Sequence, residues 1–334
     1  MHTQTYIFNS RGLLLMSAAI MFGLLVAGSV SATNRNPVAD FDGDGKTDIS
    51  VFRPSDGVWY ISKSSGGFSF LQWGISTDMP VAGDYDGDGK TDLAVYRPGL
   101  DSSRKNGSAW HILRSLDNTY LARGWGVNAG FTHDKPEPAD YDGDGKTDIT
   151  FYHMSDVVGA PSAFNILQSS TDSGIIKGWG TTADKRVPAD YDGDGKADLA
   201  VYRYSYPFES IAAPRWLIQQ SSNGATRVEL FGLRTDITVQ SDYDGDGKAD
   251  IAVWRPSNGF WYYISSLDKS FNSYQFGLSG DKPVPGDYDG DEKTDFAVFR
   301  PSNGVWYIQQ STKGFRAEQF GLGTDIPIPN TFVR

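Results

Sequence analysis

Short hydrophobic runs recur along this chain, and each is followed by a turn signal. The last unit begins with the run 296–300, and a Pro-Ser-Asn-Gly turn at 301–304 separates it from a second run at 305–308. A polar turn then leads to a third run, which ends at residue 321. Because Pro and Asn-Gly are typical of turns, and aromatic and β-branched runs are typical of strands, the unit predicts three short strands. The segment 325–329 closes the unit as a fourth short strand or edge segment, where proline is tolerated.

The same unit recurs, and an aspartate-rich nonapeptide marks each start. The nonapeptides begin at Asp40, Asp84, Asp140, Asp190, Asp242 and Asp287, so their spacings are 44, 56, 50, 52 and 45 residues. The chain continues for 47 residues after Asp287, enough for one more complete unit, without a seventh nonapeptide. Four short strands in about 45 residues is the size of a propeller blade. We expect an all-β fold: a single β-propeller domain over 33–334 with six four-stranded blades, seven being the alternative.

Both ends of the repeat array predict a closed ring. Residues 36–40 have the sequence of the tail of a closing segment, and the last unit stops just after 327–329. We expect residues 331–333 to pair with the first blade and seal the ring. A linear solenoid would need capping repeats at both ends, and the sequence shows none.

Units two, three and four are longer than the others. Their extra residues, 100–107, 155–162 and 205–214, all lie between the first and second predicted strands. Insertions at one equivalent position fall on one face of a repeat protein, often its binding face. Loop drift without a function is the alternative.

Two further residue types recur at fixed positions of the unit. Five units carry a tryptophan on the second strand: Trp59, Trp110, Trp216, Trp261 and Trp306. Packing between blades is the favoured interpretation, with a row of sugar-stacking rings as the alternative. Five units end the first strand with an arginine: Arg53, Arg97, Arg203, Arg255 and Arg300. We expect these arginines to pair with loop aspartates or stack on the tryptophans rather than bind acidic ligands. His153 takes the place of arginine in unit three.

The nonapeptide has the pattern of a metal-binding loop. Asp84–Asp92 places aspartates at positions 1, 3, 5 and 9 and glycines at positions 4 and 6. Alternating carboxylates can surround one hard cation if the chain turns sharply, and Gly89 supplies the positive φ for that turn. The carbonyl of Lys90, at position 7, would add an oxygen ligand. Ligands that are all oxygen favour Ca²⁺ over zinc or copper.

We therefore predict up to six Ca²⁺ sites. The predicted ligands are Asp40, Asp42, Asp44, Lys46 and Asp48; Asp84, Asp86, Asp88, Lys90 and Asp92; Asp140, Asp142, Asp144, Lys146 and Asp148; Asp190, Asp192, Asp194, Lys196 and Asp198; Asp242, Asp244, Asp246, Lys248 and Asp250; and Asp287, Asp289, Asp291, Lys293 and Asp295.

These loops differ from EF-hands, and one differs from the other five. An EF-hand carries a bidentate glutamate at position 12, between helices, whereas here Val51 and Val95 stand there on predicted strands. In loop six Glu292 replaces the second glycine. A side chain at positive φ costs about 1 kcal/mol, so we expect the weakest calcium binding in loop six.

Most of the acidic residues of the chain belong to the predicted metal-binding loops. The aspartates of the loops make up 24 of the 41 acidic residues, and six Ca²⁺ ions would nearly cancel the formal charge of −11. The acidic balance argues against nucleic acid as a partner. The chain has no cysteine, which excludes a disulfide scaffold.

Residues 1–32 have the features of a signal peptide. Arg11 precedes an apolar run at 13–26, and the small residues 30–32 match a cleavage site after Ala32. We expect a secreted, extracellular, periplasmic or cell-surface-associated protein with no membrane span after cleavage. An uncleaved N-terminal anchor is the alternative.

The repeated unit resembles a known family. Asp84–Asp92, followed by Leu-Ala-Val-Tyr-Arg at 93–97, is similar to the FG-GAP/VCBS repeats, whose calcium loops also occur in the integrin α-subunit propeller. The resemblance covers residues 36–329. It implies a secreted, calcium-bearing β-propeller used mainly for adhesion or ligand binding, with the six aspartate sets as the matching positions. Integrin propellers have seven blades, whereas this chain has six nonapeptides.

Catalytic motifs are absent from the sequence. Only His111, His133 and His153 remain after signal removal, and no nucleophile elbow or zinc-protease motif occurs. Asp101 and Glu209, in the insertions, are the acid/base candidates. We expect a monomeric, non-enzymatic binding or adhesion module for an extracellular protein or glycan. The alternatives are a polysaccharide-acting hydrolase or lyase and a purely structural matrix module.

Overall fold

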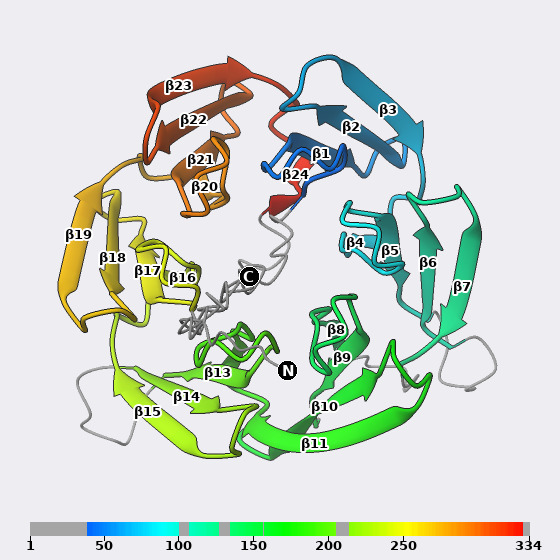
Figure 1. The fold of residues 1–334 in the computed structure, drawn as a ribbon, viewed down its shortest axis with the longest axis vertical. Coiled ribbons are helices and arrows are strands. Elements are labelled where there is room, and N and C mark those ends of the chain that lie inside the picture. The colour runs from blue at the N-terminus through cyan, green and yellow to red at the C-terminus, as the bar shows by residue number, and fades with distance from the viewer. Residues whose placement is uncertain (1–38, 100–106, 127–133, 156, 205–213, 330–334) are drawn as a thin grey trace, which may run out of the picture. The chain divides into compact units, whose positions relative to one another are not determined.

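The computed structural model describes residues 39–99, 107–126, 134–155, 157–204 and 214–329. These residues form strands and no helix, and the strands make six antiparallel four-stranded sheets. The sheets are the blades of a ring (Figure 1), so the prediction of a six-bladed β-propeller is confirmed. None of these residues belongs to a helix that could span a membrane. The predicted signal peptide, residues 331–333, His133, Asp101 and Glu209 lie outside the described ranges, as do 100–106 and 205–213 of the insertions in units two and four, whereas the insertion of unit three is described except for residue 156.

Each blade has one two-residue strand and three longer ones. Blade 1 consists of β24 (Ile326–Pro327), β1 (Ile49–Arg53), β2 (Val58–Ser62) and β3 (Phe68–Gln72). Blade 2 consists of β4 (Met79–Pro80), β5 (Leu93–Arg97), β6 (Ala109–Leu113) and β7 (Tyr120–Gly124). Blade 3 consists of β8 (Lys135–Pro136), β9 (Ile149–His153), β10 (Pro161–Leu167) and β11 (Gly174–Thr181).

The other three blades follow the same order. Blade 4 consists of β12 (Lys185–Arg186), β13 (Leu199–Arg203), β14 (Arg215–Gln219) and β15 (Thr226–Leu230). Blade 5 consists of β16 (Ile237–Thr238), β17 (Ile251–Arg255), β18 (Phe260–Ile264) and β19 (Phe271–Gln275). Blade 6 consists of β20 (Lys282–Pro283), β21 (Phe296–Arg300), β22 (Val305–Gln310) and β23 (Gly314–Gln319).

The short strand of each blade comes from the end of the preceding repeat. Figure 1 shows these short strands nearest the axis and the last strand of each blade at the rim. The sequence predicts the segment 325–329 as the close of the sixth unit, but Ile326–Pro327 pairs with β1 of blade 1, Phe52 opposite Ile326 and Val51 opposite Pro327. The ring is therefore closed by β24, since this C-terminal strand supplies the inner strand of blade 1.

The second-strand tryptophans lie in the core. Trp59, Trp110, Trp216, Trp261 and Trp306 are at most 1% exposed, and Phe164 takes the same place in blade 3. Each indole N–H donates to a carbonyl at the end of the third strand, for example Trp59 Nε1 to the Trp73 oxygen at 2.7 Å. Rings this deeply buried cannot stack on a sugar, so the packing interpretation is confirmed.

The first-strand arginines make ion pairs with buried aspartates outside the nonapeptides. Arg53 contacts both carboxylate oxygens of Asp325 at 2.9 Å, and Asp325 is fully buried. The equivalent pairs are Arg97–Asp78, Arg203–Asp184, Arg255–Asp236 and Arg300–Asp281. In blade 3, His153 Nδ1 lies 2.7 Å from Asp134. The prediction that the arginines pair with aspartates is confirmed, but the predicted location of these aspartates in the nonapeptides was wrong. Each partner instead lies just before the inner strand.

The arginines also stack on aromatic rings, but on tyrosines rather than the predicted tryptophans. The Arg53, Arg255 and Arg300 guanidinium groups lie 4.2, 4.5 and 4.3 Å from the ring centroids of Tyr60, Tyr262 and Tyr307. The physical reason is strand alternation: the tryptophans point into the core, whereas the tyrosine one residue further along points to the other side of the strand. The second-strand tyrosine therefore covers the outer side of the ion pair.

The Asp325 pair can be tested by removing its carboxylate. Asp325→Ala leaves Arg53 without its buried partner at the seam of the ring, so we expect a loss of about 3–5 kcal/mol of unfolding free energy in denaturant titrations. Asp56, which lies 4.0 Å from the same guanidinium on the exposed side, is the matched control. Asp56→Ala should cost less than about 1 kcal/mol. Equal losses in the two variants would contradict this assignment.

Candidate metal sites

The aspartate loops are shaped by hydrogen bonds from their own main chain. In the first loop Asp40 accepts from the Gly43 N–H at 2.6 Å with one oxygen and from the Gly45 N–H at 2.9 Å with the other. Asp44 accepts from the Lys46 N–H at 3.0 Å. The two glycines have φ of 79° and 81°, a conformation that few other residues adopt without strain. The chain therefore wraps around the carboxylate of position 1.

The folded loops gather carboxylates into clusters. One oxygen from each of Asp40, Asp42 and Asp48 lies within 4.8 Å of the others, and loops two and three bring positions 1, 3 and 9 together in the same way. In loops four and five the clustered positions are 1, 3 and 5, namely Asp190, Asp192 and Asp194, and Asp242, Asp244 and Asp246. Such clusters of hard oxygen donors suit Ca²⁺. The seventh-position carbonyls, those of Lys46 and its equivalents, remain predicted ligands.

The ninth aspartate joins the loop to the rest of its blade. Asp48 accepts from the Phe41 N–H at 2.8 Å and, across the blade, from the Ser64 N–H at 2.7 Å. Burial raises the pKa of Asp48, Asp148, Asp198 and Asp250 to about 6 and of Asp92 and Asp295 to about 7, although backbone N–H donors lower it in part. A carboxylate oxygen has more than one acceptor site, so these hydrogen bonds leave room for a cation.

Hydroxyl side chains between the second and third strands also hold the loop carboxylates. The Ser64 hydroxyl donates to Asp44 at 2.7 Å and the Ser65 hydroxyl to Asp42 at 2.6 Å. Loops three and four are held in the same way by Ser169 and Ser170, and by Ser221 and Ser222. This contribution was not predicted from the sequence. Its signal is the pair of hydroxyl residues that follows the second strand in most units.

The six loops are joined to one another in a closed circle. The Thr91 N–H donates to the Asp40 carbonyl oxygen at 2.6 Å, and each loop repeats this bond to the loop before it, ending with Thr47 to Asp287 at 2.6 Å. The lysine at position 7 lies over the first glycine of the preceding loop, where a Cβ on Gly43 would be 2.9 Å from Lys90 Cε. The loops surround the ring axis beside the inner strands (Figure 1).

Loop six keeps the geometry of the others despite Glu292. Its N–H donates to Asp287 at 2.8 Å, as the glycine does elsewhere, and its φ is 67°. One oxygen of Asp289 accepts three hydrogen bonds from Thr312 and Lys313. The other is buried without a hydrogen-bond partner, and an unsatisfied buried carboxylate oxygen is a favourable position for a cation. The residues present therefore fit Ca²⁺.

Fold and loops together define a six-bladed β-propeller with one aspartate loop per blade. The model of the FG-GAP-like repeat matches residues 40–95 and 242–298, and that of the FG-GAP repeat matches residues 80–112. The chain therefore contains FG-GAP-like repeats, as the nonapeptide predicts. A search of curated proteins finds no match.

Several solved propellers resemble the chain distantly. They include the Dos1 propeller (TM-score 0.44, 10% identity, covering 82% of this chain and 68% of that chain). A virginiamycin B lyase from Staphylococcus aureus has a TM-score of 0.45 and 8% identity and covers 87% of this chain and 86% of that chain. A luciferin-regenerating enzyme has a TM-score of 0.42 and 10% identity, covering 82% and 83%. Likenesses at this distance do not indicate a function.

The strain at Glu292 predicts a stabilising substitution. Glu292→Gly removes a side chain from positive φ and should raise the unfolding free energy in EDTA by about 1 kcal/mol. The reciprocal variant Gly45→Glu is the matched control, because no atom lies within 4 Å of a Cβ at Gly45 and only strain is added. It should lose about the same amount. An unchanged midpoint in both denaturant titrations would contradict the strain argument.

The raised pKa values predict an unusual pH dependence without calcium. Because the ninth-position carboxyls bind protons more tightly folded than unfolded, the calcium-free protein should gain stability as pH falls through about 7 to 5. In calcium the trend should reverse, since protons compete with the metal for the same oxygens. Denaturant titrations across this range, in EDTA and in calcium, measure both slopes. The same slope in both buffers would rule out a shared site.

Proposed function

We propose that this protein is an extracellular calcium-binding β-propeller that serves as a binding or adhesion module for a protein or glycan partner. One observation carries the proposal: the loops collect carboxylates into clusters, named in loops one to five, and all six loops form a closed circle of main-chain hydrogen bonds. Neutralising the carboxylate charge in one loop would therefore also stabilise the position of the next blade. Such a scaffold suits a rigid display surface, and extracellular calcium is abundant enough for carboxylate loops of modest affinity.

The chain's own residues would do most of the work of holding the metal. Positions 1, 3 and 5, with 9, would supply carboxylate oxygens, and the position 7 carbonyl would complete the set. When bound, Ca²⁺ supplies positive charge that offsets the repulsion among these carboxylates. The glycine N–H groups and the serine hydroxyls keep the carboxylate oxygens oriented. In this arrangement calcium is part of the scaffold rather than the ligand that defines specificity.

The two described histidines, His111 and His153, both have side-chain partners. His111 Nδ1 lies 2.7 Å from the Tyr120 hydroxyl, and the two rings stack. His153 pairs with Asp134 at the position where other blades have the structural Arg–Asp pair. Both described histidines are therefore held by side-chain partners within their own blades.

Calcium removal tests the scaffold role. Each site that binds only the folded state adds RT ln(1 + [Ca²⁺]/Kd), or roughly 1–2 kcal/mol at a few millimolar calcium. We expect EDTA to lower the melting temperature markedly, and calcium but not magnesium to restore it. A melting temperature indifferent to EDTA would refute structural calcium.

A binding panel tests the module role. The mature protein is applied, in calcium, to immobilised extracellular glycans and matrix proteins while released sugars are measured. Specific binding without turnover is the expected result. Turnover would instead establish a polysaccharide-acting hydrolase or lyase. Neither binding nor turnover on any surface would establish a structural module without a discrete ligand.

A further inference from the structure

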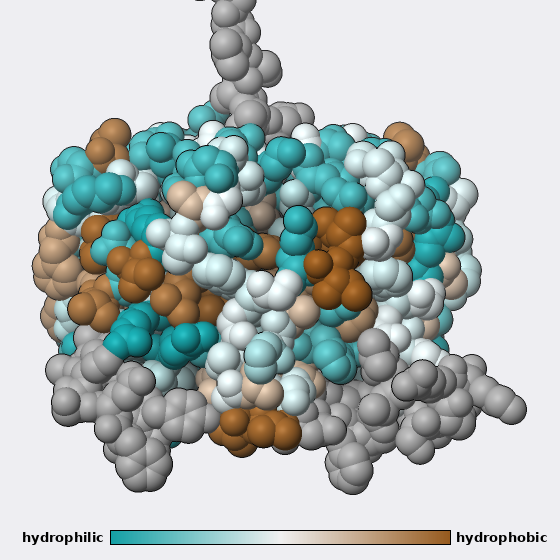
Figure 2. All heavy atoms as spheres, turned by 90° about the horizontal axis from the view of Figure 1, so that it is seen from below, coloured by the Kyte–Doolittle hydropathy of each residue, from teal (hydrophilic) through white to brown (hydrophobic). Residues whose placement is uncertain are grey.

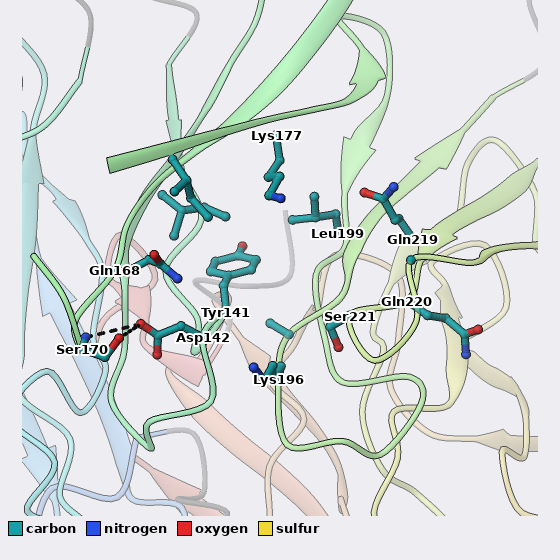
Figure 3. A pocket seen from close by; sticks show the side chains of 14 residues that line it. Tyr141, Asp142, Gln168, Ser170, Lys177, Lys196, Leu199, Gln219, Gln220 and Ser221 are labelled. Atoms are coloured by element: carbon teal, nitrogen blue, oxygen red, sulfur yellow. Dashed lines mark hydrogen bonds between the residues drawn. The ribbon is translucent and has the colours of Figure 1, made fainter. Parts of the chain in front are cut away.

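A pocket of about 510 Å³ lies between blades 3 and 4, beside loops three and four. Its walls come from β10 and β11 on one side and from β13 and the β14–β15 turn on the other (Figure 3). Its volume is within the range of sites that hold small ligands. Figure 2 shows the rim on this side of the ring, where hydrophilic residues lie between separate hydrophobic patches.

At this place the side chain of blade 3 differs from those of blades 4, 5 and 6. Lys177 lies opposite Phe164 in the register of β11. The residues at this position in blades 4, 5 and 6 are Glu229, Tyr274 and Glu318. Arg227 pairs with Glu229 at 3.1 Å, and Arg316 pairs with Glu318, which also accepts from Ser62.

Between blades 5 and 6 the corresponding space holds aromatic rings. Tyr274 stacks on Phe296 with centroids 4.9 Å apart, and Tyr263 lies beside the same ring at 6.3 Å. The residues at these three positions between blades 3 and 4 are Lys177, Leu199 and Ile166. Smaller and more flexible side chains therefore leave a cavity where the other interface is filled.

The lining combines unpaired cations, amides and an apolar surface. Among the described residues Lys177 and Lys196 have no ion pair, and Gln168 and Gln219 have no side-chain hydrogen bond. Figure 3 shows the Lys177 amine directed toward the Tyr141 ring, between Gln168 and Leu199. The carboxylate at the border is turned aside, because Asp142 accepts from the Ser170 hydroxyl at 2.6 Å.

We propose that this pocket binds an anionic sugar unit, with its carboxylate or sulfate at Lys177 and its ring against Tyr141 and Leu199. The ammonium groups suit the anion, the glutamine amides suit hydroxyls, and the apolar surface suits the ring face. The inference rests on the proposed binding role and names its site and ligand class. It also differs from the sequence prediction, which placed binding on the insertions.

The test is calorimetric titration, in calcium, with a uronic-acid disaccharide, a sulfated disaccharide and a neutral disaccharide. The wild type should bind at least one acidic sugar and favour it over the neutral sugar by about tenfold or more. Lys177→Gln, which keeps the cavity but removes the charge, should lose about tenfold in affinity. Arg123→Gln is the matched control, because Arg123 is the exposed cation at the same register position of blade 2 and should leave binding unchanged.

A filled variant tests the cavity independently of charge. Ile166→Tyr, Lys177→Tyr and Leu199→Phe together reproduce the side chains of the interface between blades 5 and 6, so the protein should keep its melting temperature and lose sugar binding. Acidic-sugar binding that this variant retains would overturn the pocket assignment and leave the proposed binding function intact. No binding of any acidic sugar by the wild type, or preference for the neutral one, would also overturn it. Turnover of the sugar would overturn the proposed function instead.

Discussion

Mutual repulsion among carboxylates is the constraint on which this structure depends. Four aspartates within nine residues, six times around one axis, are held together by N–H and O–H donors that lower the cost without removing the charge. The ninth carboxyl shows the remaining cost, because burial raises its pKa to about 6 or 7. The fold therefore concentrates negative charge where it must be neutralised by protons or cations. The glycines, serines and lysines of the loops are best understood as the framework for that neutralisation.

The blades depend on one another through three separate kinds of contact. Hydrophobic clusters join neighbouring blades, as where Val187 and Trp216 of blade 4 pack with Val253 of blade 5. Main-chain bonds join each loop to the next, and the inner strand of every blade belongs to the preceding repeat. The Arg–Asp pairs, and the His153–Asp134 pair in blade 3, then fix the segment that leads into each inner strand. Because these contacts run in the same direction around the ring, disruption of one blade affects both of its neighbours.

Much of this could be predicted from the sequence, because the relevant signals are local. The turn residues, strand lengths and aspartate spacing all lie within a single unit, so the blade count and the clustering of carboxylates could be predicted. Contacts between units could not. Nothing local shows that 326–327 pairs with β1, that Lys90 lies over Gly43, or that Ser64 reaches Asp44. The pocket could not be predicted for the same reason. It arises because Lys177 and Leu199 stand where the interface between blades 5 and 6 has aromatic rings, and those residues are far away in the chain.

The offset between repeat and blade has a consequence for how such rings change in size. Every unit receives an inner strand from the unit before it and supplies one to the unit after it. Each unit therefore takes part in two strand pairings, one with each neighbouring unit. Duplication or deletion of a whole unit would therefore leave no strand without a partner at the junction. The seam at β24 and β1 would also survive, since it repeats the pairing used at every other junction. Gene-level gain or loss of units can thus alter the circumference while the local pairing rules remain the same.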